Sequence, residues 1–324
     1  MRYDADGAAT GRRLTEAGLE VALAPKTGAR SPRELAALAA AADAAIVSTD
    51  PFDATVFAAA PRLRVIARVG VGTDSIDLDA ATAAGVAVTI TPGANHETVA
   101  DHALALVLAA VRRVLEHDAS VRRGEWNRAG ALTPWDVHGA TVGLVGYGAI
   151  GHAVGRRLAG FGVRLLVADP AADPGPGIEL AGLDELLARS DVVSLHLPLA
   201  RGTEHLIGAD QLARMQPHAI LVNTSRGGVV DEGALVAALR GGRLRAAALD
   251  VFASEPHVAA ELRTLPNVVL TPHVGGLSER SIASMTAEAT DCVLAGLAGR
   301  LDRTRVANPA VLGRVPRARR MLAP

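Results

Sequence analysis

Residues 141–151 read Thr-Val-Gly-Leu-Val-Gly-Tyr-Gly-Ala-Ile-Gly, and residues 163–169 read Val-Arg-Leu-Leu-Val-Ala-Asp. An apolar strand, a glycine-rich turn, a helix and a second apolar strand follow one another, and an acid closes the unit. Gly146, Gly148 and Gly151 have the G-x-G-x-x-G spacing of a dinucleotide-binding strand–helix–strand unit. The stretch therefore predicts an α/β domain with a doubly wound parallel sheet and a dinucleotide site.

Each part of this motif has a physical role. The first glycine makes the tight turn, the second lets the backbone approach a pyrophosphate, and the third lets the helix pack close to the strand. The N–H groups at the start of the helix face the phosphates, so the predicted cofactor contacts run continuously through the turn, over Gly146, Tyr147, Gly148, Ala149, Ile150 and Gly151. Asp169 would accept hydrogen bonds from a ribose and repel a 2′-phosphate, which favours NAD over NADP.

The composition excludes several classes of protein. The chain has 324 residues, enough for two domains, and 49% of them are apolar. Its net charge of −1 offers no attraction for nucleic acid or an anionic membrane, and no apolar run is long enough to span a bilayer. Cys292 is the only cysteine, which excludes an intrachain disulfide and favours a reducing compartment. We expect a cytoplasmic protein with a small-molecule substrate.

Strands and helices already alternate before the glycine motif, which indicates a parallel sheet there too. The predicted strands are residues 19–23, 45–47, 64–68 and 86–89, and the predicted helices are residues 31–42, 52–60, 76–84 and, as one long helix, 97–115. Ser31 and Pro32 have the helix-starting positions of N-cap and first residue. No good strand precedes the first helix, around residues 11–17.

The pattern continues after Asp169 and completes a doubly wound sheet of roughly six strands. The predicted strands are residues 192–195, 219–223, 246–250 and 268–270, and the helices are residues 183–188, 208–215, 232–240 and 279–298. Residues 170–177 are rich in proline and glycine and are predicted to form a turn.

Three of these strands are followed by residues suited to acid–base chemistry. Arg226, Glu255 and His273 each come shortly after a strand, and ligands bind at the carboxyl ends of strands in open α/β sheets. An arginine fork suits a substrate carboxylate, and a histidine suits proton transfer. A neighbouring carboxylate would fix the histidine tautomer.

The order of the motifs resembles the D-isomer-specific 2-hydroxyacid dehydrogenase family, which includes D-3-phosphoglycerate dehydrogenase and glyoxylate/hydroxypyruvate reductases. The resemblance runs from about residue 64 to residue 299. It covers Arg68-Val-Gly-Val-Gly-Thr-Asp74, Thr91-Pro-Gly-Ala-Asn95, the glycine motif, His196-x-Pro198, Asn223-Thr-Ser-Arg226-Gly, Asp250-Val-Phe-x-x-Glu255-Pro and Pro272-His273-x-Gly-Gly.

The resemblance implies roles for individual residues. Arg226 would bind the substrate carboxylate and polarise the carbonyl, and Glu255 with His273 would form the acid–base pair. Asp250 would hold the nicotinamide carboxamide. Further cofactor contacts are expected from His196, Pro198, Thr203 and Thr224, although a purely structural turn at His196 is an equal alternative. The substrate would also meet Arg68, Val69, Gly70 and Asn95.

The resemblance also implies an architecture and an activity. A Rossmann domain, residues 95–279, would be inserted into a flavodoxin-like substrate domain, residues 1–94 and 280–324, and the long helix would support a homodimer. The implied reaction is NAD-dependent hydride transfer at C2 of a small D-2-hydroxy acid or 2-keto acid, such as D-3-phosphoglycerate, glyoxylate or hydroxypyruvate. The alternative is a dinucleotide-sensing, co-repressor-like binding protein.

No metal site is expected. His96 and His102 resemble a zinc helix at first sight, but their spacing is not that of H-E-x-x-H. Six residues correspond to about 240° around a helix, so the two rings do not share a face.

Overall fold

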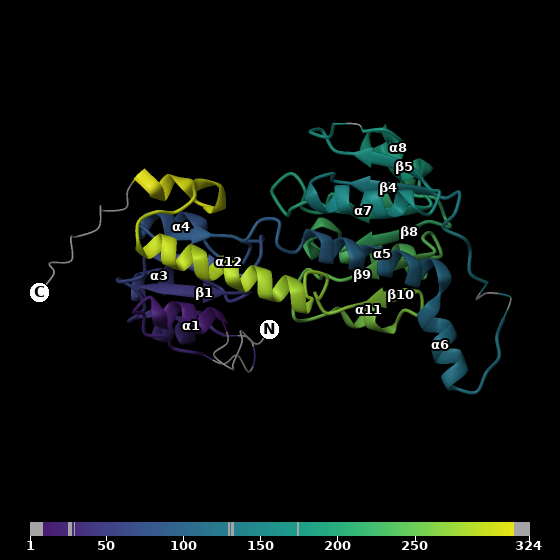
Figure 1. Cartoon of the computed structure of the whole chain (residues 1–324). Helices are drawn as coiled ribbons and strands as arrows, with labels where there is room; N and C mark the ends of the chain where they lie inside the picture. Colours follow the sequence, from purple (N-terminus) through teal and green to yellow (C-terminus); the bar gives the residue numbers. More distant parts are fainter. Residues whose placement is uncertain are drawn as a thin grey trace, which may run out of the picture. The chain divides into compact units, whose positions relative to one another are not determined.

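The computed structural model describes residues 9–24, 28, 30–128, 130, 133–173 and 175–313, which form two compact units (Figure 1). Unit 1 holds the described residues up to Asn95 and those from Ser278 onward, and unit 2 runs from His96 to Leu277. The chain therefore leaves unit 1, builds unit 2 and returns to unit 1.

Unit 2 contains a sheet of seven parallel strands in the order β10-β9-β8-β7-β4-β5-β6. The order reverses on either side of β4, which is the doubly wound arrangement that the glycine motif predicts. The fold class is thus confirmed. The strands are β4 (Thr141–Val145), β5 (Arg164–Ala168), β6 (Ile178–Leu180), β7 (Val192–Leu195), β8 (Ile220–Asn223), β9 (Ala246–Leu249) and β10 (Val268–Leu270).

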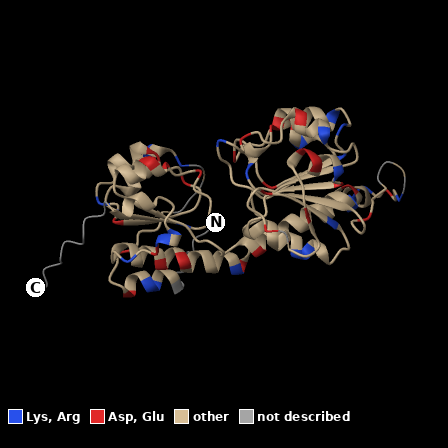
Figure 2. Cartoon of the chain, turned by 90° about the horizontal axis from the view of Figure 1, so that it is seen from above, with Lys and Arg blue, Asp and Glu red and all other residues tan. Residues whose placement is uncertain are grey.

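Helices cover both faces of this sheet. Two of them, α5 (His96–Arg112) and α7 (Ala149–Ala159), lie side by side over one face (Figure 1). The other face packs against α8 (Leu183–Arg189), α9 (Ala209–Arg214), α10 (Glu232–Arg240) and α11 (Ala260–Thr264). Because both faces are covered, the central strands read as continuous apolar runs, and Figure 2 shows charged residues mostly on helices and loops.

An ion-pair cluster joins α5 to α7. Glu97 accepts from both Arg157 (Nη1–Oε2, 2.7 Å) and Arg156 (Nη2–Oε1, 2.6 Å), and Arg157 also pairs with Asp101. The hydrogen bonds from Arg157 and then Arg156 lower the pKa of Glu97 to about 2. The start of α5 is therefore anchored to the helix that follows the glycine turn.

Unit 1 contains three parallel strands in the order β1-β2-β3, namely β1 (Ala44–Val47), β2 (Val65–Arg68) and β3 (Ala87–Thr89). One face packs on α2 (Pro32–Ala39), α3 (Ala54–Ala59) and α4 (Leu78–Ala83). The other packs on α1 (Ala9–Glu16) and α12 (Glu279–Leu297), and a Cβ on Gly296 would lie 2.9 Å from that of Val65. Ser31 is the N-cap of α2, as predicted, and its side chain forms a complete capping box with Glu34.

The chain after α12 is hydrogen-bonded to the backbone of β3 and of the residue before it. Asn308 accepts a hydrogen bond from the Val88 N–H (2.8 Å) and donates to the Val86 carbonyl (2.9 Å). Two short 3-10 helices, η3 (Arg303–Arg305) and η4 (Pro309–Gly313), flank this contact. The Asn308 side chain and an antiparallel backbone bridge between Thr89 and Val306 thus cover the edge of β3.

The predicted strand at residues 19–23 is wrong, because residues 19–24 have no ladder partner among the described residues. Leu19 donates its N–H to the Leu14 carbonyl, and Arg30 donates to the Ala24 carbonyl. These backbone groups are therefore used outside a sheet. The stretch before Ala9 lies outside the described residues, so the expectation about a missing first strand is not tested.

The predicted long helix at residues 97–115 is also wrong in its extent. Arg113 has a left-handed φ of 52°, which ends α5 at Arg112, and α6 (Val114–Arg122) begins directly afterwards. The side chain of Arg113 bonds Glu116 at 3.0 Å, which supports the break. A left-handed residue costs about 1–2 kcal/mol and stops helical hydrogen bonding.

The sheet has one strand more than predicted. β6 is an edge strand that pairs with β5 directly after the proline- and glycine-rich turn. Three residues are too few to show a hydrophobic period, so the sequence offered no signal for it.

The close approach at Gly151 gives a stability test. A Cβ at Gly151 would overlap the carbonyl group of Gly146, whereas a Cβ at Gly148 meets no atom within 4 Å. We expect Gly151→Ala to lower the free energy of unfolding by about 2 kcal/mol, because α7 must move away from β4. Gly148→Ala should change it by less than about 0.5 kcal/mol. Urea unfolding of both variants measures this, and equal midpoints would contradict the assigned packing role.

Candidate functional site

The glycine turn between β4 and α7 has two packed positions and one open position. Gly146 has a φ of +90°, and a Cβ there would lie 2.6 Å from the His196 carbonyl oxygen. Gly151 has no room for a side chain either, whereas Gly148 faces open space. The three positions therefore fit their predicted roles of turn, ligand approach and helix packing.

The start of α7 is suited to bind an anion. Gly148 is its N-cap and has no side chain to satisfy the first N–H groups of the helix. Gly148 and Ala149 are exposed and Ile150 is partly buried, so these groups lie at the surface. Tyr147 instead turns its ring inward, where burial raises its pKa and a Cβ on Gly155 would lie 3.0 Å from its hydroxyl.

Asp169 joins the glycine turn to the end of β5. Its Oδ2 accepts from the Tyr147 N–H at 2.7 Å, and its Oδ1 accepts from the Ala171 N–H at 2.8 Å. A carboxylate has about four lone-pair sites, so it can still accept from the hydroxyls of a ribose. The two backbone bonds orient the carboxylate for that role.

Two buried polar atoms follow β7 and β8. His196 Nδ1 and Thr224 Oγ1 have no hydrogen-bond partner among the described residues, while His196 Nε2 lies 2.9 Å from Ser194 Oγ. Burial lowers the pKa of His196 to about 4, so the imidazole is neutral at pH 7. Unsatisfied buried polar atoms cost about 1–3 kcal/mol each, so a ligand with matching groups would be stabilised here. Together with the open position at Gly148, the residues fit a dinucleotide.

The loop after His196 is closed by Thr203. Its hydroxyl donates to the Pro198 carbonyl (2.6 Å) and accepts from the Ala200 N–H (2.8 Å). Pro198 is exposed, and Thr203 is partly buried. The loop of residues 198–203, which was predicted to border the cofactor, is therefore closed by two hydrogen bonds of its own Thr203 hydroxyl.

Arg226 is positioned by a buried asparagine at the end of β8. Asn223 Nδ2 donates to the Arg226 carbonyl (2.9 Å), and its Oδ1 accepts from the N–H and hydroxyl of Ser225. The Arg226 Nη1 donates to the Ser225 carbonyl at 2.7 Å. Because a guanidinium offers five donors in a planar fork, the side chain can still grip a carboxylate.

Glu255 and His273 form a direct pair. His273 Nδ1 lies 2.7 Å from Glu255 Oε2, and Glu255 Oε1 accepts from the Phe252 N–H at 3.0 Å. Both side chains are about one-third exposed, at 33% and 38%. The carboxylate fixes one ring nitrogen, which leaves Nε2 on the opposite edge to exchange a proton. Arg226, Glu255 and His273 follow the neighbouring strands β8, β9 and β10.

Asp250 organises the loop that carries His273. It is 1% exposed, and it accepts hydrogen bonds from the Thr271 hydroxyl (2.6 Å), the Val274 N–H (2.9 Å) and the Gly275 N–H (2.8 Å). Burial acts to raise the pKa of Asp250, but these bonds and that of His102 outweigh it and hold the pKa below its ordinary value. The sequence suggested only a cofactor contact for Asp250, because the partners of a buried carboxylate leave no pattern.

The predicted substrate residues of unit 1 lie at the end of β2, on the loop after it and just before α5. Arg68 folds back, donates to the Val69 carbonyl at 2.7 Å and covers Gly70, whose φ is +129°. The N–H groups of Val69 and Gly70 are used inside unit 1, since Val69 donates to the Val47 carbonyl and Gly70 donates to Thr91 Oγ1 at 2.9 Å. Asn95 is the last residue of this part of unit 1.

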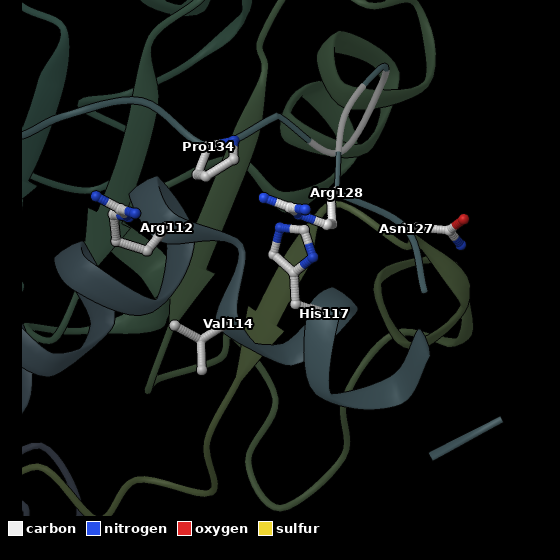
Figure 3. A pocket seen from close by; sticks show the side chains of 6 residues that line it. All are labelled: Arg112, Val114, His117, Asn127, Arg128 and Pro134. Carbon is white, nitrogen blue, oxygen red and sulfur yellow. The ribbon is translucent and has the colours of Figure 1, made fainter. Parts of the chain in front are cut away.

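An open surface depression of about 550 Å³ in unit 2 is lined by none of the predicted site residues (Figure 3). Side chains of α5, of α6 and of the loop before β4 surround it, namely Arg112, Val114, His117, Asn127, Arg128 and Pro134. Among the described residues, no cluster of histidine, cysteine or acidic side chains could hold a metal ion. Within the same ranges, no helix has the length and apolar character needed to cross a membrane.

The chain belongs to the D-isomer-specific 2-hydroxyacid dehydrogenase family. Residues 104–275 match the family's NAD-binding domain. The chain is 46% identical over 276 residues to the glyoxylate reductase of Korarchaeum cryptofilum, a match that covers 83% of each chain. It also resembles the D-lactate dehydrogenase of Aquifex aeolicus, solved with NAD and lactic acid, with a TM-score of 0.81, 28% identity, and coverage of 92% of this chain and 96% of that one.

A third relative is longer. The D-3-phosphoglycerate dehydrogenase of Mycobacterium tuberculosis (strain ATCC 25618 / H37Rv) is 46% identical over 263 residues, which is 80% of this chain. The chain spans about half the length of that relative, since the match covers 50% of it.

Proposed function

We propose that the protein is an NAD-dependent dehydrogenase that transfers a hydride between nicotinamide and C2 of a small D-2-hydroxy acid or 2-keto acid. D-3-phosphoglycerate, glyoxylate and hydroxypyruvate are the candidate substrates. The observation that carries this proposal is the 2.7 Å Glu255–His273 pair, at the carboxyl end of a sheet whose glycine turn is open to a ligand. The relatives are named as reductases and dehydrogenases, which favours an enzyme over a dinucleotide-sensing binding protein.

The side chains divide the reaction between them. A bound nicotinamide supplies or accepts the hydride. Arg226 binds the substrate carboxylate and polarises the C2 oxygen. In oxidation, His273 Nε2 takes the hydroxyl proton as the C2 hydride leaves and the C=O bond forms; in reduction it returns that proton. Glu255 stabilises the imidazolium through the bond to Nδ1.

Removal of His273 tests the catalytic assignment. We expect His273→Ala to lower kcat at least about 100-fold, because the proton then has no acceptor in the site. NADH affinity, measured by fluorescence titration, should stay within about twofold, and the matched surface variant His138→Ala should behave as wild type. The wild type is first assayed with glyoxylate, hydroxypyruvate, pyruvate and 3-phosphohydroxypyruvate. The variants are then assayed with the acids that the wild type reduces. Undiminished turnover of His273→Ala would refute the assignment.

We propose that the cofactor is NAD rather than NADP, because Asp169 presents a negative charge where the 2′-phosphate of NADP would lie. The expected kcat/KM with NADH exceeds that with NADPH at least about 100-fold. Asp169→Asn removes the charge and keeps one acceptor oxygen, so this ratio should fall at least tenfold. Equal wild-type efficiencies with the two cofactors would contradict the proposal.

We further propose that the protein is a cytoplasmic homodimer. A reducing compartment is supported by Cys292, a buried free thiol. The dimer is supported by α6 and the residues after it, which expose Val114 (52%), Leu115 (50%), Val121 (56%) and Trp126 (79%). Such a gathering of exposed apolar side chains marks an interaction surface, and a second copy of the chain is the partner proposed.

A charge on this surface should disrupt the dimer. Val121→Glu places an unpaired carboxylate in the apolar contact, so we expect the mass from light scattering to fall to that of one chain at micromolar concentration. Leu180→Glu, on the exposed edge strand β6, is the matched control and should leave the mass unchanged. A dimer that survives Val121→Glu, or a monomeric wild type, would exclude this interface.

A further inference from the structure

His102 on α5 contacts the network around Asp250. Its Nε2 lies 3.0 Å from Thr271 Oγ1 and 3.3 Å from Asp250 Oδ1, and its side chain is only 20% exposed. A Cβ on Gly275 would lie 3.3 Å from the ring and 2.8 Å from Asp250 Oδ2. A helix residue thus reaches the ends of both β9 and β10.

The distances determine where the protons lie. The Thr271 hydroxyl is 2.6 Å from Asp250 Oδ1, so its proton points to the carboxylate and its oxygen is an acceptor. An unprotonated Nε2 would direct its lone pair at both that oxygen and the carboxylate. Neither of these acceptors could then donate to it, and the contacts would be repulsive. Nε2 of His102 therefore carries a proton and donates it to Thr271, with Asp250 as a longer second acceptor.

The same network holds the backbone of His273 from both sides. Thr271 precedes His273, while Val274 and Gly275 follow it and donate their N–H groups to Asp250. The His273 N–H donates to the Asp250 carbonyl at 2.8 Å. His273 itself has a left-handed φ of 53°, a strained conformation that persists only when its surroundings enforce it.

We propose that His102 is a positioning residue, whose Nε2–H holds Thr271 and Asp250 so that the loop presents His273 to the substrate. This inference rests on the proposed function. His102 acts through Thr271 and Asp250, and a misplacement of about 1 Å at a reacting group can cost about 100-fold in rate. Residues that orient metal ligands change activity about 10- to 100-fold when they are removed, and we expect an effect of the same order from a residue that orients a catalytic loop.

A pair of amide variants separates the donor from the bulk of the ring. His102→Gln places an amide nitrogen the same number of bonds from Cβ as Nε2, whereas His102→Asn places it at the shorter Nδ1 position. His102→Leu removes the donor, and His138→Leu is the control, because His138 is exposed and bonds only the Phe161 carbonyl among the described contacts. All four are made in the full chain.

The first measurement is hydrogen exchange of the peptide spanning residues 268–277, with NADH present. We expect exchange to speed up at least about tenfold in His102→Asn and His102→Leu, because the loop loses a donor that closes it. His102→Gln and His138→Leu should exchange as wild type. Unchanged exchange in His102→Leu would overturn the proposal, and so would equal acceleration in His102→Gln.

The second measurement is steady-state turnover of the 2-keto acid that the wild type reduces with the highest kcat/KM. We expect kcat to fall at least about tenfold in His102→Asn and His102→Leu, and to stay within about threefold in His102→Gln. KM should change less than about twofold, since Arg226 binds the carboxylate. If His102→Gln is as slow as His102→Leu, the donor role is refuted. If the wild type turns over no acid, the proposed function fails, while the exchange result still decides whether His102 holds the loop.

Discussion

The turn between β4 and α7 is the steric constraint on which the rest of unit 2 depends. Gly146 lies so close to the His196 carbonyl, and Gly151 so close to Gly146, that a single added methyl group would separate strand from helix. The turn also lies where the strand order reverses, between β4 and its neighbour β7. Close backbone packing therefore leaves one glycine, Gly148, facing open space at the start of a helix, where an anion is stabilised.

Buried polar side chains also position the groups proposed to react. Asn223 fixes the backbone that carries Arg226, and Asp250 fixes the backbone that carries His273. Both are 1% exposed, so each hydrogen bond forms away from competing water. The partly exposed residues of the proposed site are therefore held from behind by buried hydrogen bonds.

Much of the fold could be predicted from the sequence, since apolar periods and helix-capping residues act locally. The central strands and the N-cap at Ser31 are examples. The failures have local causes too. Residues 19–23 have a strand-like composition but use their backbone groups outside a sheet, Arg113 adopts a left-handed conformation that no pattern predicts, and β6 is too short to show a period.

The sequence by itself determined the doubly wound sheet and the glycine turn, and it singled out Arg226, Glu255 and His273 as candidates, because these depend on residue type and spacing along the chain. Only the tertiary structure decided which atoms meet. It paired His273 with Glu255, turned Asp250 and His102 toward the loop after β10, and used the Val69 and Gly70 N–H groups inside unit 1. The reason is that a hydrogen bond depends on distances of a few tenths of an ångström, set by how helices and strands far apart in sequence pack together.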